Sequence, residues 1–324
     1  MTVGGRRFDL LGFGEVLVLF QAAAGESLGV AREVALHVAG AEFNACAAAS
    51  RLGAKTALCT RLGADPLADQ VRSRARECDV AIVAVADADR PTGLFLKDVR
   101  PDGDRHVYYY RSTSAASAMG EADADRGLAT EPRVVLLSGL TSALGDGPRQ
   151  MAERVAATAR QRRIRVALDV NLRPQLGRLS DSIDSVRRML PSVEFLIVGV
   201  DDAKALFGED APDRITAAAR TAGCAEVVIT AGPNGSWWQD ENGTMIHQET
   251  LASTIADPVG AGDAFAGAYL AGRLAGLSRR SSCWLGSAFA AAVIAAPGDT
   301  AGLPSASRAR EMLHQATQLE ELNA

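Results

Sequence analysis

Short apolar runs alternate with amphipathic or alanine-rich segments along most of this chain. Apolar runs predict strands at 10–19, 56–62, 80–85, 134–138, 166–169, 195–198 and 227–230. Helical periodicity predicts helices at 41–52, 67–78, 148–161, 181–190, 201–207 and 213–223, and a buried helix within 283–297. This alternation of strands and helices predicts an α/β fold with a mostly parallel sheet and helices on both faces. Strands that are apolar throughout indicate burial on both sides.

Two segments break this rhythm. Residues 16–38 show little helical period, and residues 93–111 alternate with a period of two. Such alternation indicates a half-exposed antiparallel sheet, and Arg100-Pro101-Asp102-Gly103-Asp104 is a good hairpin turn. We expect these two segments to form a small lid over the carboxyl ends of the parallel strands. No linker or repeat is evident, so a single domain over residues 1–324 is expected.

Composition narrows the class of protein. The 324 residues are 48% hydrophobic and 23% charged, with a net charge of −5, so a nucleic acid partner is not expected. Five cysteines without a CxxC pair indicate free thiols in a reducing cytoplasm, and four scattered histidines make a protein-built metal site unexpected.

Two apolar stretches have some features of a targeting or membrane segment. The run at 283–297 is too short to span a bilayer, which needs about 20 residues. The segment after Arg6 and Arg7 superficially resembles a signal peptide, but Asp9 and Glu15 interrupt its apolar core. A cytoplasmic location and no membrane partner are therefore expected.

The strongest chemical signal is a glycine-rich turn before a helix, at Asp257-Pro258-Val259-Gly260-Ala261-Gly262-Asp263-Ala264-Phe265. Gly260 and Gly262 allow a ligand to approach the backbone closely. The first N–H groups of a helix attract anions, so the amides of Gly260, Ala261, Gly262 and Asp263 could hold a transferring phosphoryl group. Asp263 would then be the base that takes a hydroxyl proton. The alternative is an ordinary turn with an acidic residue in the first helical turn.

This string resembles the signature of the ribokinase-like (PfkB) family of carbohydrate kinases, Asp-Thr-x-Gly-Ala-Gly-Asp-x-Phe, with Pro258 in place of threonine. The resemblance covers residues of about 8 to 304. It implies a ribokinase-like three-layer sandwich with a β-sheet lid, ATP as phosphoryl donor, and a homodimer or higher oligomer formed through the lid.

A second segment, residues 37–46, resembles the family motif Gly-Gly-x-x-x-Asn-x-Ala, with Ala39 replacing the first glycine. The resemblance implies that Gly40 and Asn44 contact sugar hydroxyls. An asparagine amide offers both a donor and an acceptor, which suits neighbouring hydroxyls. The alternative is that Asn44 is an N-terminal helix cap.

A third segment selects within the family. Tyr109 and Arg111 share one face of a predicted strand, and Arg173 follows another strand, so two guanidinium groups could converge on a carboxylate. Tyr-x-Arg followed by Ser-Ala-Ala at 114–116 is similar to 2-keto-3-deoxygluconate kinases, although Phe95 stands where that subfamily uses a tyrosine. The alternative is an aromatic stripe on a dimer-forming lid with exposed arginines.

Nucleotide contacts are expected at other strand ends, since no P-loop sequence is present. The candidates are Thr230, Gly232 and Gly235 after one strand, Asn171 after another, and the loop near 296–299. Taken alone, Gly-Pro-Asn-Gly at 232–235 is also an ordinary β-turn.

Magnesium handling departs from the family pattern. Gly199 and Asp202 stand where many relatives carry Asn-x-x-Glu to organise magnesium-bound water. We therefore expect Mg²⁺ to be held by nucleotide phosphates and water, and no metal ligand is assigned.

The leading hypothesis is an ATP-dependent kinase that phosphorylates 2-keto-3-deoxygluconate at O6. The alternatives are a neutral-sugar kinase of the fructokinase or ribokinase type, and a non-catalytic sugar-binding protein. In each case the expected partner is a small sugar or sugar acid.

Overall fold

The computed structural model describes residues 8–22, 26–99, 105–240, 242–296, 298 and 300–321. Arg6, Arg7, the hairpin turn expected at 100–104, and residues 297 and 299 of the expected nucleotide loop lie outside this part of the chain.

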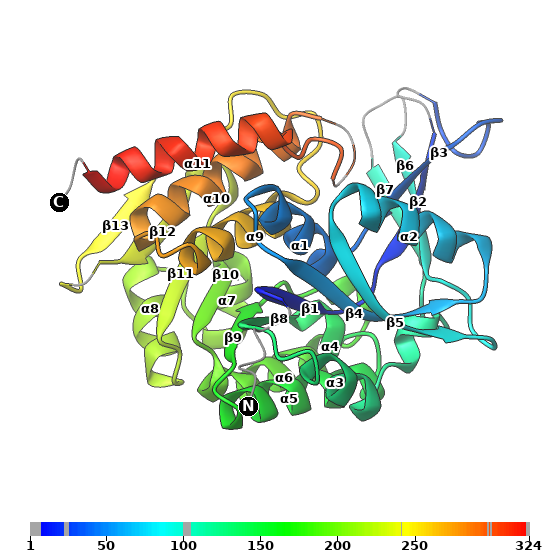
Figure 1. The fold of residues 1–324 in the computed structure, drawn as a ribbon, viewed down its shortest axis with the longest axis horizontal. Helices are drawn as coiled ribbons and strands as arrows, with labels where there is room; N and C mark the ends of the chain where they lie inside the picture. The colour runs from blue at the N-terminus through cyan, green and yellow to red at the C-terminus, as the bar shows by residue number, and fades with distance from the viewer. Residues whose placement is uncertain are drawn as a thin grey trace, which may run out of the picture.

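A twisted sheet of nine strands forms the centre of the molecule (Figure 1). Its members are β1 (Leu10–Phe13), β4 (Thr56–Gly63), β5 (Val80–Asp87), β8 (Val134–Ser138), β9 (Arg165–Asp169), β10 (Phe195–Gly199), β11 (Glu226–Thr230), β12 (Ser236–Gln239) and β13 (Met245–Gln248). The order is β13-β12-β11-β10-β9-β8-β1-β4-β5. All neighbours pair in parallel except β11 with β12 and β12 with β13, which are antiparallel.

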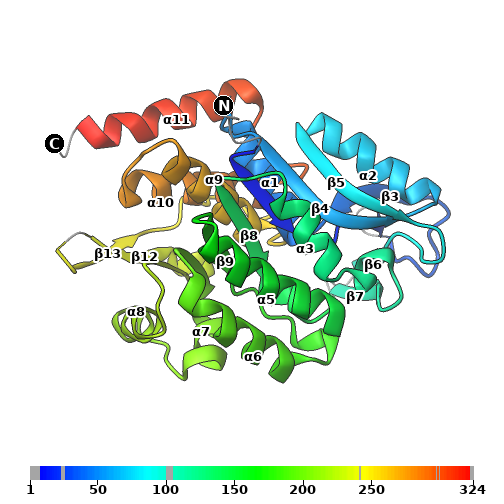
Figure 2. The same ribbon diagram turned by 60° about the horizontal axis from the view of Figure 1, so that its bottom comes forward.

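Helices cover both faces of this sheet (Figures 1 and 2). One layer contains α1 (Ala41–Arg51), α2 (Pro66–Glu77), α9 (Ala261–Leu274) and α10 (Arg279–Ile294), with α11 (Ala306–Glu321) outside α10. The other contains α3 (Glu121–Leu128), α5 (Asp146–Gln161), α6 (Leu179–Met189), α7 (Val200–Phe207) and α8 (Pro212–Thr221). Short helical turns are α4 (Gly139–Ser142), η1 (Ala115–Ala118), η2 (Pro174–Leu176), η3 (Leu190–Ser192) and η4 (Gly232–Asn234).

Alternate residues of the central strands enter two separate cores. In β8, Val135 and Leu137 pack in the core that contains Val155 of α5, whereas Leu136 packs in the core that contains Phe265 of α9. Apolar side chains on both faces are what a buried parallel strand requires. The three-layer α/β architecture predicted from the sequence is thus confirmed.

The helix that matters most for the site, α9, is fixed against α1. Gly267 of α9 lies so close to the neighbouring helix that a Cβ atom there would come within 2.0 Å of the Ala45 carbonyl oxygen. The contact leaves no room for a side chain at residue 267. It therefore sets where α9 begins relative to α1.

A second sheet of four strands forms the predicted lid, at the right of Figure 1. Its strands are β2 (Leu17–Gln21), β3 (Ala35–Ala39), β6 (Leu94–Val99) and β7 (Arg105–Tyr110), in the order β3-β2-β6-β7. The β2–β3 and β6–β7 pairs are antiparallel as expected, but β2 and β6 pair in parallel.

The single strand expected at 10–19 is wrong, because the chain divides there between the two sheets. β1 ends at Phe13 and β2 starts at Leu17. A Cβ atom on Gly14 would lie 2.1 Å from a Glu42 carboxylate oxygen, and the Glu15 side chain is buried in an ion pair with Arg111. These contacts turn the backbone out of the large sheet and into the lid. Helix α3 and the antiparallel strands β12 and β13 are present in addition to the elements predicted from the sequence.

Other expectations concern the chain as a whole. The five cysteines are free and buried. Within the described ranges, no helix combines the length and the apolar character that crossing a bilayer requires.

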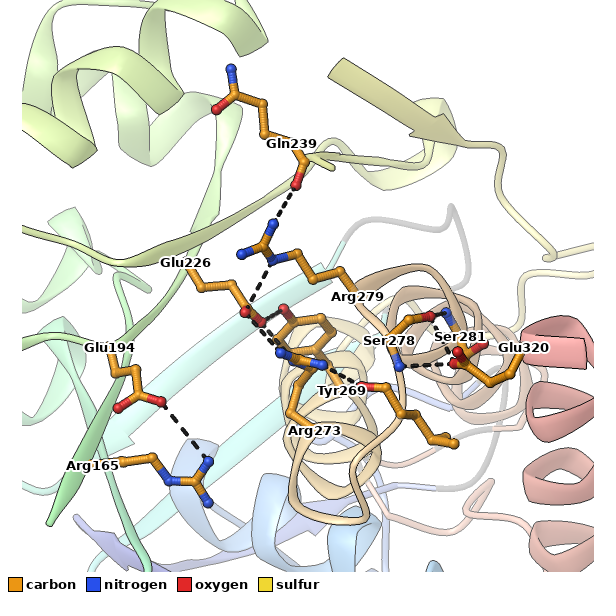
Figure 3. Close-up of polar contacts among 11 residues, drawn as sticks. Arg165, Glu194, Glu226, Gln239, Tyr269, Arg273, Ser278, Arg279, Ser281 and Glu320 are labelled. Atoms are coloured by element: carbon orange, nitrogen blue, oxygen red, sulfur yellow. Dashed lines mark hydrogen bonds and ion pairs between the residues drawn. The ribbon is translucent and has the colours of Figure 1, made fainter. Parts of the chain in front are cut away.

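A buried charge network joins the far end of α9 to the sheet (Figure 3). Glu226, the first residue of β11, accepts hydrogen bonds from Tyr269, from Arg273 Nε and Nη2 at 2.9 and 3.1 Å, and from Arg279 Nε at 3.1 Å. Arg279 also donates to the carbonyl oxygen of Gln239, at 3.0 Å. One carboxylate therefore ties together β11, α9 and the start of α10.

Replacing Glu226 with glutamine should destabilise the protein by about 3 kcal/mol, because removing one partner of a buried pair leaves the other charges uncompensated. The measurement is urea unfolding followed by circular dichroism. Glu311→Gln is the control, because Glu311 forms an exposed pair with Arg308 and exposed pairs contribute little. Equal stability of Glu226→Gln and the wild type would contradict this assignment.

Candidate active site

A cavity of about 670 Å³ lies between the inner face of the lid and the carboxyl ends of the parallel strands. The lid contributes Leu17, Phe95, Lys97, Val107, Tyr109 and Arg111. The strand ends contribute Asp169, Asn171, Arg173, Gly199 and Thr230, and the starts of α1 and α9 contribute Gly40, Asn44, Gly260, Gly262 and Asp263. Ligands of open α/β sheets bind at this edge.

The start of α9 faces this cavity with free backbone donors. Gly260 has a left-handed conformation (φ 83°) and is the N-cap, so the helix begins at Ala261. The first N–H groups of a helix have no partner within it. A Cβ atom on Gly262 would meet nothing within 4 Å, so the turn is open to the cavity and a side chain there would occupy ligand space. This cradle fits an anionic group.

Asp263 is held by two asparagine side chains. Asn44 donates from Nδ2 to Oδ2 at 2.8 Å, and Asn171 donates from Nδ2 to Oδ1 at 3.4 Å. Burial raises the pKa of Asp263 to about 6, and the Glu42 charge adds to this rise, whereas the Asn44 hydrogen bond and Arg173 oppose it. The carboxylate is therefore ionised at neutral pH but more basic than an ordinary aspartate.

Asn171 connects two carboxylates from an unusual backbone conformation. Its φ is 36°, in the left-handed region that asparagine tolerates better than most residues. Its amide also lies 3.4 Å from Asp169 Oδ2. Burial, together with the charges of Asp263 and Asp202, raises the pKa of Asp169 well above its usual range. Carboxyl groups are thus gathered on the sheet side of the cavity, where burial and mutual repulsion disfavour ionisation of Asp169.

On the lid, Arg111 is buried and held at one edge. Its Nε donates to Glu15 Oε2 at 2.7 Å, and Ser114 donates to the other oxygen of Glu15. The guanidinium carbon lies 5.4 Å from the centre of the Tyr109 ring. Within the described chain Arg111 Nη2 is buried and has no hydrogen-bond partner. A buried donor without a partner is costly unless a ligand supplies one.

Of the other residues predicted for the site, Arg173 and Thr230 line the cavity and the two glycines of the 232–235 turn do not. Arg173 lines the cavity from an exposed position, and its Nη1 donates to the Leu172 carbonyl oxygen at 3.2 Å. Thr230 also lines the cavity, but Gly232 and Gly235 do not. Gly235 has a packing reason of its own, because a Cβ atom there would lie 2.0 Å from the Gln248 carbonyl oxygen.

Gly40 and Asn44 lie at the start of α1. Gly40 is the N-cap, and a Cβ atom on it would lie 2.4 Å from the Glu15 carbonyl oxygen. Asn44 makes no capping hydrogen bond and instead contacts Asp263. Its Oδ1 is buried without a partner among the described residues.

Sequence reasoning missed several residues around the cavity. Glu15 supports Arg111 from the point where the chain leaves the large sheet, and no pattern marks it. Glu42 is buried beside the site, accepts hydrogen bonds from Ser138 and Thr141, and has a pKa raised by burial. Lys97 was recognisable, since the period of two places it on the same face of β6 as Phe95.

Few of the described side chains around the cavity could bind a metal ion directly. Among the described residues, no three His, Cys, Asp or Glu side chains are grouped to hold a metal ion. Asp202 lines the cavity but its Oδ2 accepts the Leu172 N–H at 3.3 Å.

The chain is similar in sequence to known carbohydrate kinases. The family model described as pfkB family carbohydrate kinase matches residues 9–306. A 2-dehydro-3-deoxygluconokinase of Thermoproteus tenax is 31% identical over 316 residues, which cover 94% of each chain. A 2-dehydro-3-deoxygalactonokinase of Haloferax volcanii is 29% identical over 297 residues, covering 90% of this chain and 93% of the relative.

Solved structures show the same fold. Arabidopsis thaliana ribokinase complexed with ribose and ATP superposes with a TM-score of 0.76 at 20% identity, covering 94% of this chain and 98% of the ribokinase. The central sheet, the two helical layers and the four-stranded lid are thus those of the ribokinase-like fold. Because the family model matches most of its length, this chain belongs to the pfkB family of carbohydrate kinases.

Proposed function

We propose that this kinase phosphorylates a 2-keto-3-deoxy sugar acid, with 2-keto-3-deoxygluconate as the leading substrate and O6 as the acceptor. The observation that supports this most directly is the buried Arg111 guanidinium, which lines the cavity with an unpartnered Nη2. A neutral sugar offers no charge to such a group, whereas a carboxylate matches the fork of a guanidinium. The names of the two relatives support the same substrate class.

Arg111 and Arg173 together would bind the substrate carboxylate. Arg111 is fixed by Glu15, so little side-chain entropy is lost when it binds, while Arg173 closes the site from the exposed rim. Tyr109 and Asn44 line the cavity and would contact hydroxyl groups, Asn44 through an Oδ1 that has no partner among the described residues. Phe95 packs against Tyr109 with ring centres 5.7 Å apart and presents an apolar surface where a hydroxyl contact was expected in the subfamily.

At the other end of the substrate, Asp263 would accept the proton of the terminal hydroxyl. Asn44 and Asn171 orient its carboxylate, and its raised pKa makes it a stronger base at neutral pH. The amides of Gly260, Ala261, Gly262 and Asp263 would stabilise negative charge on the transferring group, which is the main catalytic requirement in phosphoryl transfer.

Magnesium-ATP, when bound, supplies the phosphoryl group. Asn171 and Thr230 line the cavity on the sheet side and would contact the nucleotide. The turn with Gly232 and Gly235 lies directly after Thr230, outside the cavity lining, and would contact the parts of the nucleotide that extend beyond it. Phosphates and water would complete the magnesium coordination.

The substrate assignment is tested by ADP release over a panel of sugar acids and matched neutral sugars. The wild type should turn over a 2-keto-3-deoxy acid best. Arg111→Ala and Arg173→Ala should each lower kcat/KM for that acid by about 10²-fold, since a charge-assisted hydrogen bond contributes about 1.5–3 kcal/mol. Activity toward neutral sugars should change little in Arg173→Ala. In Arg111→Ala, which also leaves the buried Glu15 charge unpaired, it should fall less than activity toward the acid.

Arg308→Ala is the control for this series, because Arg308 lies on the exposed surface of α11. A preference of the wild type for fructose or ribose would make the protein a neutral-sugar kinase. Melting shifts with sugar acids but no ADP from any acceptor would indicate a sugar-binding protein without activity.

The pH dependence tests the role of Asp263. Because its pKa is raised to about 6, the carboxylate form should be lost as the pH falls through about 6, and kcat/KM should fall with it. Asn44→Ala removes a hydrogen bond that holds this pKa down, so the midpoint should move to higher pH. The measurement is kcat/KM between pH 5 and pH 9.

Asp263→Asn is the companion variant, and its kcat should fall by about 10²- to 10⁴-fold. Its stability should change in the opposite direction. The folded pKa is raised from the ordinary 3.8, so ionisation of Asp263 destabilises the folded state at neutral pH. The variant should therefore melt above the wild type at pH 8, with the difference vanishing below the ordinary pKa. A variant with more than a tenth of wild-type activity would exclude Asp263 as the base.

We also propose that the outer face of the lid forms a homodimer. Two cross-strand rows on this face are apolar, namely Leu36, Phe20, Leu96 and Tyr108, and Val38, Val18, Leu94 and Tyr110. Val18 and Val38 of the second row are buried in the core of the subunit, so the association surface consists of the other side chains. Leu36, Tyr108 and Tyr110 are 42%, 45% and 60% exposed. Exposed apolar area of this kind favours association.

Tyr108→Asp should convert the dimer to a monomer, because a charge buried without a partner in the interface is costly. Light scattering after size-exclusion chromatography measures the mass. Leu251→Asp, at another apolar residue that is 40% exposed, should leave the mass unchanged. A monomeric wild type at micromolar concentration would refute this interface.

A further inference from the structure

A buried ion pair joins the lid to the turn that precedes α9. Lys97 of β6 extends its ammonium group to the carboxylate of Asp257, three residues before Gly260. Lys97 is only 3% exposed and Asp257 only 4%. Both charges have thus been removed from water at a point where two parts of the fold meet.

The Asp257 carboxylate also contacts two backbone segments. Its Oδ1 accepts the N–H of Val259 at 3.3 Å, and its Oδ2 lies 3.5 Å from the N–H of Gly298. The Asp257 N–H in turn donates to the Ile294 carbonyl oxygen at the end of α10, at 3.1 Å. The position of this carboxylate therefore influences where Val259 lies and where the amides that follow it point.

Lys97 belongs to the face of the lid that lines the cavity. Cross-strand pairing places it opposite Val107, next to the pair formed by Phe95 and Tyr109, and all four side chains line the cavity. A substrate held against this face also fixes the strand from which the ammonium group extends. The ion pair is thus a physical connection between the sugar side of the cavity and the phosphate side.

Stability alone is a poor explanation for this pair. Desolvation of two charges costs as much as their attraction returns, and an apolar pair of similar volume is often as stable. The energy of a charge-assisted hydrogen bond depends more strongly on distance and direction than that of an apolar contact. Its placement between the lid and the anion cradle indicates a role in alignment.

We propose that Lys97 is a positioning residue that couples the lid to the amide cradle. With the lid in place over the substrate, its ammonium group holds Asp257, and Asp257 holds the Val259 turn so that the amides of Gly260–Asp263 are aimed at the transferring group. The inference rests on the proposed function of this cradle. Lys97 acts through Asp257 and is assigned no contact with the reacting atoms.

The test compares Lys97→Met, which keeps the aliphatic stem, with the double variant Lys97→Met/Asp257→Asn, which removes both charges. Lys204→Met is the matched control, because Lys204 lies on α7 with a side chain that is 68% exposed. Assays use the substrate that the wild type turns over best. Lys97→Met should lower kcat by about 10²-fold, since small misplacements of catalytic groups have effects of that size, with KM for ATP changed less than about threefold.

Two further measurements separate alignment from folding. In the double variant no buried charge is left unpaired, so its melting temperature should recover while its kcat stays low. Propylammonium added to Lys97→Met should restore part of kcat, and tetramethylammonium, which has no N–H donors, should not. Recovery of both melting temperature and kcat in the double variant would overturn the proposal, as would wild-type kcat in Lys97→Met.

Hydrogen exchange gives a readout that needs no substrate. Peptides covering 256–264 should exchange faster in Lys97→Met and in the double variant than in the wild type, while peptides of β11 should be unchanged. Unaltered exchange at 256–264 would overturn the inference. If the wild type phosphorylates no sugar acid, the proposed function fails, but this comparison still decides whether Lys97 orders the turn.

Discussion

The site depends on placing a carboxylate directly beside backbone amides that must receive an anion. These two requirements conflict, because the positive end of α9 would stabilise an aspartate as an ordinary first-turn residue. The fold resolves the conflict by burying Asp263, which together with the Glu42 charge raises its pKa to about 6. Asn44 and Asn171 orient the carboxylate, and the Asn44 hydrogen bond limits this rise. The first-turn amides then remain available, since the side chain is held away from them.

The lid has two faces with different roles, and a period of two along its strands separates them. Toward the cavity it carries the Arg111–Glu15 pair, Tyr109 and the Lys97–Asp257 link. Away from the cavity, two of its cross-strand rows are apolar. In the functions proposed above, substrate recognition, alignment of the turn before α9 and association would therefore each use a different set of lid residues.

Much of this arrangement could be predicted from the sequence, where the signal was local. Strands such as 134–138 are apolar on both faces, and the glycines of 260–262 stand before a long apolar helix, so the sheet and the start of α9 followed from short patterns. Tyr109 and Arg111 were placed on one face by strand periodicity alone. The contacts that were missed join residues far apart in sequence. Glu15 meets Arg111 across 96 positions and Lys97 meets Asp257 across 160, and no local pattern specifies such a partner.

The break at Gly14–Val16 was hidden for a related reason. Apolar residues stand on both sides of Glu15, and a single charged residue does not show that the chain changes sheet. The buried Glu42 carboxylate and the Glu15–Arg111 pair, both products of the tertiary fold, divert the chain there. This break has a consequence for how such cavities can change in evolution. Three residues, 14–16, connect β1 to β2 of the lid. Because this connection is short, it sets the distance between the lid and the large sheet, and an insertion there would shift the register of β2. A change of substrate would therefore come from substitutions of side chains that line the cavity, and not from insertions or deletions in the connection between β1 and β2.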